Sequence, residues 1–191
     1  GLGGMRMQNT VQMEELASHG YVVLAMDHPY DANVTIFSDG SIARFRSGLR
    51  DGVSEKEFWE VRLPQINTRA ADLSFVIDQI ENWKGDGKIL WELIDISKVG
   101  VFGHSFGGAT GIVAAFMDSR IDACLNLDGW MEPVESGIIQ VGLNIPFLYI
   151  GQEEWEDTPL NYPKLDSLIE SSNGTKEVLP GTKHFDFSDT P

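Results

Sequence analysis

The chain has 191 residues, the size of one domain with a single substantial core. Its composition is that of an ordinary globular protein, and no apolar run approaches the ~20 residues that a membrane-spanning helix needs. The formal net charge of −15, from 29 acidic and 14 basic residues, argues against a nucleic-acid partner, because phosphates require a basic surface. The same charge disfavours electrostatic adhesion to anionic membranes.

The first part of the chain predicts a helix, a strand and a hairpin. Met5–Ser18 has apolar residues at helical spacing and ends before His19-Gly20, a plausible C-cap. Tyr21–Met26 is a short, almost entirely apolar run, which is typical of a strand buried on both faces. A small hairpin is expected over residues 35–45, with its turn at Asp39-Gly40.

The remainder alternates helical and extended patterns. Residues 46–66 are polar and irregular, with one short helix expected near Glu55–Val61, and a new helical pattern runs from Thr68 to Trp83. A short amphipathic piece ends at Leu93. Further strands are expected at Val99–Phe102, Ile121–Leu127, Ile145–Ile150 and Lys176–Leu179, and helices at Ser105–Met117 and Tyr162–Glu170. This alternation indicates βαβ units and a mainly parallel, three-layer α/β sheet.

The sharpest motif is the G-x-S-x-G string Gly103-His104-Ser105-Phe106-Gly107, followed by Gly108. It directly follows an apolar strand and opens a helix, the setting that a nucleophile elbow requires. Glycines are needed in so sharp a turn because a Cβ would collide with the neighbouring strand or helix. The pattern predicts an α/β-hydrolase fold with Ser105 as the nucleophile, at a helix N-terminus that favours negative charge.

A serine nucleophile needs a base and an acid, which follow it in the order Ser, Asp/Glu, His in this fold. His184 is the histidine that comes after Ser105, on a loop behind the last expected strand, so we expect it to be the base. The acid is either Asp128, after one strand, or one of the carboxylates after the next strand. Spacing alone does not choose among Asp128, Glu153, Glu154 and Asp157.

The oxyanion formed during acyl transfer needs two backbone N–H donors. We expect one from Phe106, which follows the nucleophile, and the other from Leu2, in the glycine-rich loop before the first core helix. No metal or organic cofactor is expected, since no ligand cluster is present. The single cysteine, Cys124, lies in an apolar stretch and is expected to be buried and inert.

Three segments together resemble the platelet-activating-factor acetylhydrolases of the plasma and type II kind. They are Gly103–Thr110, the segment Leu127–Met131 with Pro133, and the late His184; the opening Gly-Leu-Gly-Gly matches the family's oxyanion loop. The resemblance implies a calcium-independent α/β-hydrolase that cleaves short acyl chains from phospholipids, with Asp128 as the acid. It also implies that Trp130 lines the acyl pocket, and His104 is assigned to the same pocket.

Gly129 and Glu132 depart from the Ala and Phe more often found in the animal enzymes, as a microbial relative with altered substrate choice would. We therefore expect a serine esterase acting on a small-molecule ester or phospholipid, with contact to a membrane or lipoprotein surface as a further expectation. The alternatives are a broad short-chain esterase or cutinase-like polyester hydrolase, and an inactive binding module of the same fold.

The domain prediction is one α/β-hydrolase domain over residues 1–191. It is expected to lack the N-terminal strands and C-terminal helix of a longer protein, because the chain opens without an initiator Met and ends soon after His184. The sequence says little of localisation, with a secreted protein favoured, and nothing of oligomeric state.

Overall fold

A computed structural model describes residues 1–191 except 47, 50, 85–86, 88, 156–157 and 190–191. Its centre is a parallel four-stranded sheet in the order β3-β4-β5-β6. The strands are β3 (Val99–His104), β4 (Ile121–Leu127), β5 (Phe147–Gly151) and β6 (Thr175–Val178). Because all four run in the same direction, the loops that follow them meet at one edge of the sheet.

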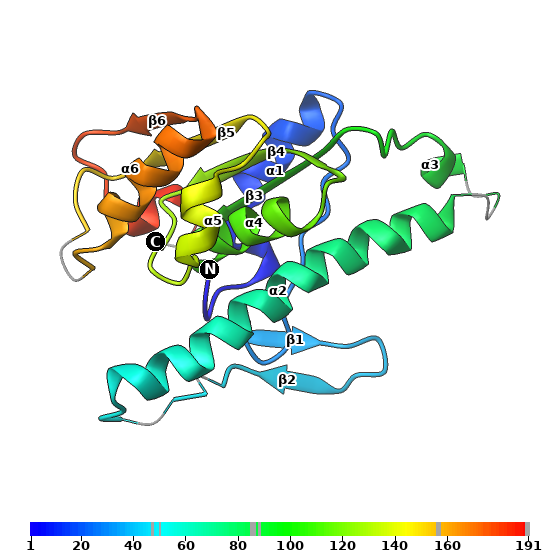
Figure 1. Cartoon of the computed structure of the whole chain (residues 1–191). Coiled ribbons are helices and arrows are strands. Elements are labelled where there is room, and N and C mark those ends of the chain that lie inside the picture. Colours follow the sequence, from blue (N-terminus) through cyan, green and yellow to red (C-terminus); the bar gives the residue numbers. More distant parts are fainter. Residues whose placement is uncertain (47, 50, 85–86, 88, 156–157, 190–191) are drawn as a thin grey trace.

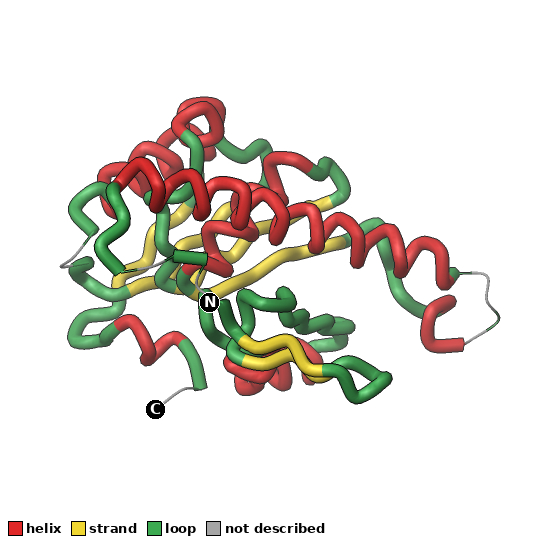
Figure 2. The backbone as a smooth tube through the Cα atoms, turned by 90° about the horizontal axis from the view of Figure 1, so that it is seen from below, coloured by secondary structure: helices red, strands yellow, loops and turns green. Residues whose placement is uncertain are grey.

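Helices lie on both faces of this sheet (Figures 1 and 2). One face carries α2 (Glu55–Trp83), α4 (Phe106–Met117), α5 (Ser136–Val141) and α6 (Asn161–Ser172), and the other carries α1 (Thr10–Ser18). Short helical pieces complete the described elements: η1 (Arg6–Asn9), α3 (Ile89–Glu92) and η2 (His184–Phe187). The three-layer α/β architecture expected from the sequence is confirmed.

The core lies between the sheet and the helices α2 and α4, which cover one of its faces. Ala109, Ile112 and Ala114 on α4 are fully buried, because this helix is almost entirely apolar and is enclosed by α2, β3 and β4. Cys124 on β4 is 2% exposed, and burial raises the pKa of its thiol to about 12. The thiol is therefore protonated and unreactive at neutral pH, as the sequence predicted.

Helix α2 is longer than the sequence predicted. Ser54 caps it, accepting a hydrogen bond from the Glu57 backbone N–H, and the helix then continues without a break through Pro64. The expectation of an irregular stretch with one short helix was wrong. A proline removes one backbone hydrogen bond, but Ile66 and Ala70, which follow it, are each 1% exposed in the core, and that burial holds the helix together.

The expected strand at Tyr21–Met26 is not formed. The segment is extended, but the backbone of residues 22–26 makes no hydrogen bond to any described residue. A cavity of about 1580 Å³ lies between this segment and β3 and is lined largely by apolar side chains from both. An apolar run becomes a strand only when a neighbour pairs with it, and no described strand pairs with this run.

The other expectations were close. The hairpin is present as β1 (Val34–Ile36) paired antiparallel with β2 (Ile42–Arg44), around the turn at Asp39-Gly40. The predicted first helix is divided into η1 and α1, and the last strand begins at Thr175 rather than Lys176. Within the described residues, every helix is either too short or too polar to cross a bilayer.

Candidate active site

Ser105 occupies the sharp turn between β3 and α4. Its backbone has φ 60° and ψ −126°, a conformation that costs energy for any residue other than glycine. Two hydrogen bonds to the neighbouring β4 end hold it there: its N–H donates to the carbonyl of Leu127 (3.1 Å), and its carbonyl accepts from the N–H of Trp130 (3.1 Å). The strained turn thus places the side chain of Ser105 at the carboxyl edge of the sheet.

Two glycines of the motif are required by space. A Cβ on Gly103 would lie 2.4 Å from the backbone carbonyl group of Gly107, and a Cβ on Gly108 would lie 2.5 Å from Oδ1 of Asn126. Gly129 is constrained in the same way, because its Cβ would lie 2.1 Å from the same Asn126 oxygen. The glycine at 129, which departs from the family pattern, is thus the residue that fits beside Asn126 here.

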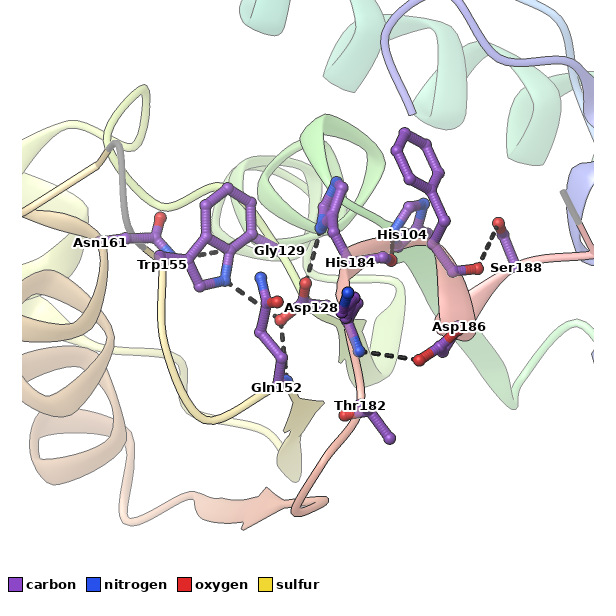
Figure 3. A network of polar contacts seen from close by, with 12 residues as sticks. His104, Asp128, Gly129, Gln152, Trp155, Asn161, Thr182, His184, Asp186 and Ser188 are labelled. Carbon is purple, nitrogen blue, oxygen red and sulfur yellow. Dashed lines mark hydrogen bonds and ion pairs between the residues drawn. The ribbon is translucent and has the colours of Figure 1, made fainter. Parts of the chain in front are cut away.

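A short hydrogen bond joins Asp128 and His184 (Figure 3). Nδ1 of His184 donates to Oδ2 of Asp128 across 2.6 Å. Asp128 follows β4 directly, is fully buried and has φ 43°, a left-handed conformation that Asp tolerates better than most residues. His184 opens η2 after β6 and remains partly accessible. The structure therefore brings together the two residues that the sequence proposed as acid and base.

The alternative acids lie elsewhere. Glu153 is exposed and accepts a hydrogen bond from the backbone N–H of Gly181. Glu154 is also exposed, and Asp157 lies outside the described residues. Of the four candidate acids, Asp128 is the one that the described structure places against His184.

His104 is buried, with 2% of its surface exposed, and both its ring nitrogens are bonded. Nε2 donates to the backbone carbonyl of His184 (2.8 Å), so Nδ1 is the nitrogen that accepts from the side-chain amide of Gln8 (3.2 Å). Burial, together with the nearby His184 side chain, lowers the pKa of His104 to about 4. His104 is therefore a neutral residue packed against His184, with both ring nitrogens occupied, and its assignment to the substrate pocket stays a prediction.

His104, Asp128 and His184 have the donor types of a metal site, and their ligand atoms lie within 4.8 Å of one another. Both nitrogens of His104 are already used, however, and Asp128 is bonded to His184. This arrangement suits proton transfer. Nδ1 of His184 holds its proton in the hydrogen bond to Asp128, so Nε2 of His184 is unprotonated and can act as a base.

Sequence reasoning missed three further donors to Asp128. Oδ1 accepts from the hydroxyl of Tyr149 (3.0 Å), the backbone N–H of Gln152 (3.0 Å) and Nε1 of Trp155 (3.1 Å). Burial and the charge of Asp128 raise the pKa of Tyr149, so its hydroxyl stays a donor. Tyr149 lies within an apolar strand run, and Gln152 contributes its backbone N–H, so the sequence pattern gives no signal for these donors.

Asn161 was also missed, and it holds the loop that carries Asp128. Its fully buried side chain accepts from the backbone N–H of Met131 (2.5 Å) and donates to the carbonyl of Gly129 (3.1 Å). Because both bonds go to backbone, they fix the path of the chain immediately after Asp128, with no dependence on the side chains of that loop.

The two expected oxyanion donors, Leu2 and Phe106, lie in the N-terminal loop and at the start of α4. Phe106 is the first residue of α4, and no described residue accepts a hydrogen bond from its N–H or from that of Leu2. Gly1 adjoins the nucleophile, since a Cβ built on it would lie 3.7 Å from Oγ of Ser105. The loop is anchored by hydrogen bonds from the N–H of Gly3 to the carbonyl of Asp31 and from Asn33 to the carbonyl of Gly4.

Trp130 lies in an aromatic cluster between the acid loop and α2. Its ring stacks with Trp59 (centroids 6.1 Å apart) and meets Phe58 (5.9 Å) and Phe106 (5.6 Å). Trp130 is half-buried, so it both packs these elements together and presents part of its surface two residues from the acid.

Several known proteins are similar to this chain in sequence or in structure. The chain matches the family described as "Platelet-activating factor acetylhydrolase, isoform II" over residues 1–191. The platelet-activating factor acetylhydrolase of Canis lupus familiaris is 30% identical over 208 residues, covering 99% of this chain and 46% of that protein. A probable 1-alkyl-2-acetylglycerophosphocholine esterase of Arthroderma benhamiae is 27% identical over 188 residues, covering 93% and 44%.

Among solved structures, a ferulic acid esterase from Streptomyces cinnamoneus has a TM-score of 0.76 and 30% sequence identity, and the match covers 99% of this chain and 51% of that one. The chain thus spans about half the length of the relatives it matches. It has the α/β-hydrolase fold and belongs to the platelet-activating factor acetylhydrolase isoform II family.

Proposed function

We propose that this chain carries the catalytic centre of a serine carboxylic-ester hydrolase. The observation that supports this most strongly is the 2.6 Å contact between His184 and Asp128 at the same sheet edge as the strained Ser105 turn. Burial of the Asp128 carboxylate costs desolvation free energy, and a catalytic triad gives a functional reason for that burial. An intact set of three such groups argues against an inactive binding module.

The reaction follows from the tautomer of His184. Because Nδ1 donates its proton to Asp128, Nε2 is free to accept the proton of the Ser105 hydroxyl as the oxygen attacks the ester carbonyl. The described structure shows no hydrogen bond between Ser105 and His184, and such contacts often tighten only with substrate bound. Asp128 stabilises the imidazolium that results.

The tetrahedral oxyanion would be held by the N–H groups of Leu2 and Phe106, with the N-terminus of α4 favouring its negative charge. Collapse of this intermediate breaks the ester bond, and His184 gives its proton to the departing alkoxide oxygen. Water then attacks the acyl group on Ser105 with the same base, which releases the acid and restores the serine hydroxyl.

We propose esters with a short acyl group on a phospholipid-like alcohol as the substrate class, which the family membership and the names of the relatives support. Aryl or simple short-chain esters are the second candidate. The structural relative is named a ferulic acid esterase, and three aromatic rings, those of Trp130, Trp59 and Phe58, cluster next to the acid loop. Rates on an sn-2 acetyl phospholipid and on an aryl ester would separate the two.

Replacing the nucleophile tests the proposal. Ser105→Ala should lower kcat/KM by about four orders of magnitude or more, because oxyanion binding remains but the covalent step is lost. Ser136→Ala, at an exposed position in α5, should leave the rate unchanged and serves as the matched control. A fluorophosphonate probe should label Ser105, as located by peptide mapping. Full ester hydrolysis by Ser105→Ala would refute the mechanism.

A further inference from the structure

The carboxylate of Asp128 is bonded on both oxygens, and its two sides differ in kind. Oδ2 faces His184, whereas Oδ1 receives three neutral donors, from Tyr149, Gln152 and Trp155, at 3.0 to 3.1 Å. Figure 3 shows Gln152 and Trp155 converging on the carboxylate opposite His184. Neutral donors stabilise a buried carboxylate without a cation to compete for it, so the charge of Asp128 remains available to His184.

Trp155 differs from the other two donors because it also touches the base. Its ring centroid is 4.8 Å from that of His184, with the ring planes at 71°, while its Nε1 is 3.1 Å from Asp128. A single side chain therefore fixes the carboxylate through a hydrogen bond and limits the rotation of the imidazole through its ring. Tyr149 and the Gln152 backbone act on the carboxylate alone.

We propose that Trp155 is a positioning residue that fixes Asp128 and His184 relative to each other and moderates the proton affinity of His184. The inference rests on the proposed Ser–His–Asp chemistry. The N–H of Trp155 draws electron density toward Oδ1 of Asp128, which weakens the pull of Oδ2 on the His184 proton. Without that donor, the carboxylate holds the imidazolium more strongly, and His184 loses its proton at higher pH.

The other titratable groups around the pair can be separated from this effect. They are His104 beneath His184, Tyr149 and Tyr162 around Asp128, Lys183 and Asp186 beside His184 on its own segment, and Glu153 bonded to Gly181. Burial lowers the pKa of His104 to about 4 and raises the pKa of both tyrosines. Between pH 6 and 8, His104 and the two tyrosines therefore stay neutral.

Trp155→Phe tests the proposal because it keeps an aromatic ring beside His184 and removes the N–H. The direct readout is the downfield proton resonance of the His184 imidazole, assigned by its absence in His184→Ala and titrated in the resting protein. We expect its midpoint to rise by on the order of half a pH unit or more. The acidic limb of kcat/KM against pH should move in the same direction.

Two comparisons sharpen the result. Tyr149→Phe removes a second donor to the same oxygen, so its midpoint should rise as well. Trp83→Phe removes an indole N–H far from the site, where Trp83 packs against Trp91, and should leave the midpoint unchanged. A folded Trp155→Phe protein with the wild-type midpoint, or an equal shift in Trp83→Phe, would overturn the proposal. The titration needs no substrate, so it decides the role of Trp155 even if no ester is hydrolysed.

Discussion

The helix that follows Ser105 and the N-terminal segment next to it differ strongly in how tightly they are packed. In α4, which follows Ser105, eight residues are buried. In α1, none is, and between residues 1 and 46 the buried side chains are Ala32, Thr35 and Ala43. Ser105, Asp128 and His184 lie on the packed sheet half, whereas Leu2, the proposed oxyanion donor, lies in a thinly packed segment held by backbone hydrogen bonds. Local opening should therefore displace Leu2 long before it disturbs the His184–Asp128 pair.

The largest expected effect breaks the packed side at the turn itself. Gly103→Ala should lower the free energy of unfolding by about 4 kcal/mol or more, because its Cβ would meet the Gly107 backbone at 2.4 Å, where no side chain can rotate away. Gly137→Ala in α5 has no atom within 4 Å of its Cβ and should change stability by less than about 1 kcal/mol. Chemical denaturation measures both, and similar midpoints would contradict the close packing of the turn.

A matched pair of truncations compares the two regions directly. Ile112→Ala in α4 should cost about 2–5 kcal/mol, because Ile112 is fully buried and the deletion leaves a cavity. Val11→Ala in α1 should stay within about 0.5 kcal/mol, since Val11 is 66% exposed. Urea denaturation of both variants checks the contrast. A cost at Val11 close to that at Ile112 would show that α1 is packed as tightly as α4.

The smallest effect concerns acid pH. His104 has its pKa lowered from an ordinary 6.5 to about 4, so the unfolded chain binds a proton more readily than the folded one between these values. Stability should therefore fall as the pH drops from 6.5 toward 4, by at most about 3 kcal/mol from this residue. His28, whose pKa is also lowered by burial, adds to the slope in the same direction.

His104→Gln removes the titrating group and keeps hydrogen-bonding capacity toward Gln8 and the His184 carbonyl. Its unfolding free energy should vary less with pH between 6.5 and 4 than that of the wild type, with the slope of His28 left in place. Denaturant midpoints at several pH values give the comparison. A slope equal to the wild type would mean that His104 takes up its proton at the same pH in the folded and unfolded chain.

Structural features that depend only on residues adjacent in the sequence could be predicted. The elbow around Ser105 needs only a strand, a turn and a helix in succession, and β3, β4 and β5 coincide with runs that are rich in apolar residues. Tyr21–Met26 has the same kind of run, yet it forms no strand, because pairing depends on a neighbour and its composition says nothing about one. The opposite error concerns residues 55–66, which were expected to be irregular apart from one short helix. They are part of α2, and the burial of Ile66 and Ala70 outweighs the hydrogen bond that Pro64 cannot make.

The candidate site likewise contains residues that a local motif identifies and residues that only tertiary packing brings together. Ser105 and His184 could be read from the motif and from chain order, but the acid was chosen by family resemblance, because several carboxylates follow suitable strands. The hydrogen bonds of Tyr149 and Trp155 to Asp128 depend on how β5 and its following loop pack against β4. No spacing rule encodes such a contact between side chains that are 21 and 27 residues from the acid.

The open side of β3 has a consequence for the behaviour of this chain in solution. With β4 as its single partner in the described sheet, β3 presents a row of unpaired backbone groups to an apolar cavity, and such an edge is a template for another chain to add a strand. The net charge of −15 opposes that encounter by mutual repulsion. Because dissolved salt shortens the reach of this repulsion to about 10 Å at 0.1 M, the colloidal stability of the chain depends on ionic strength.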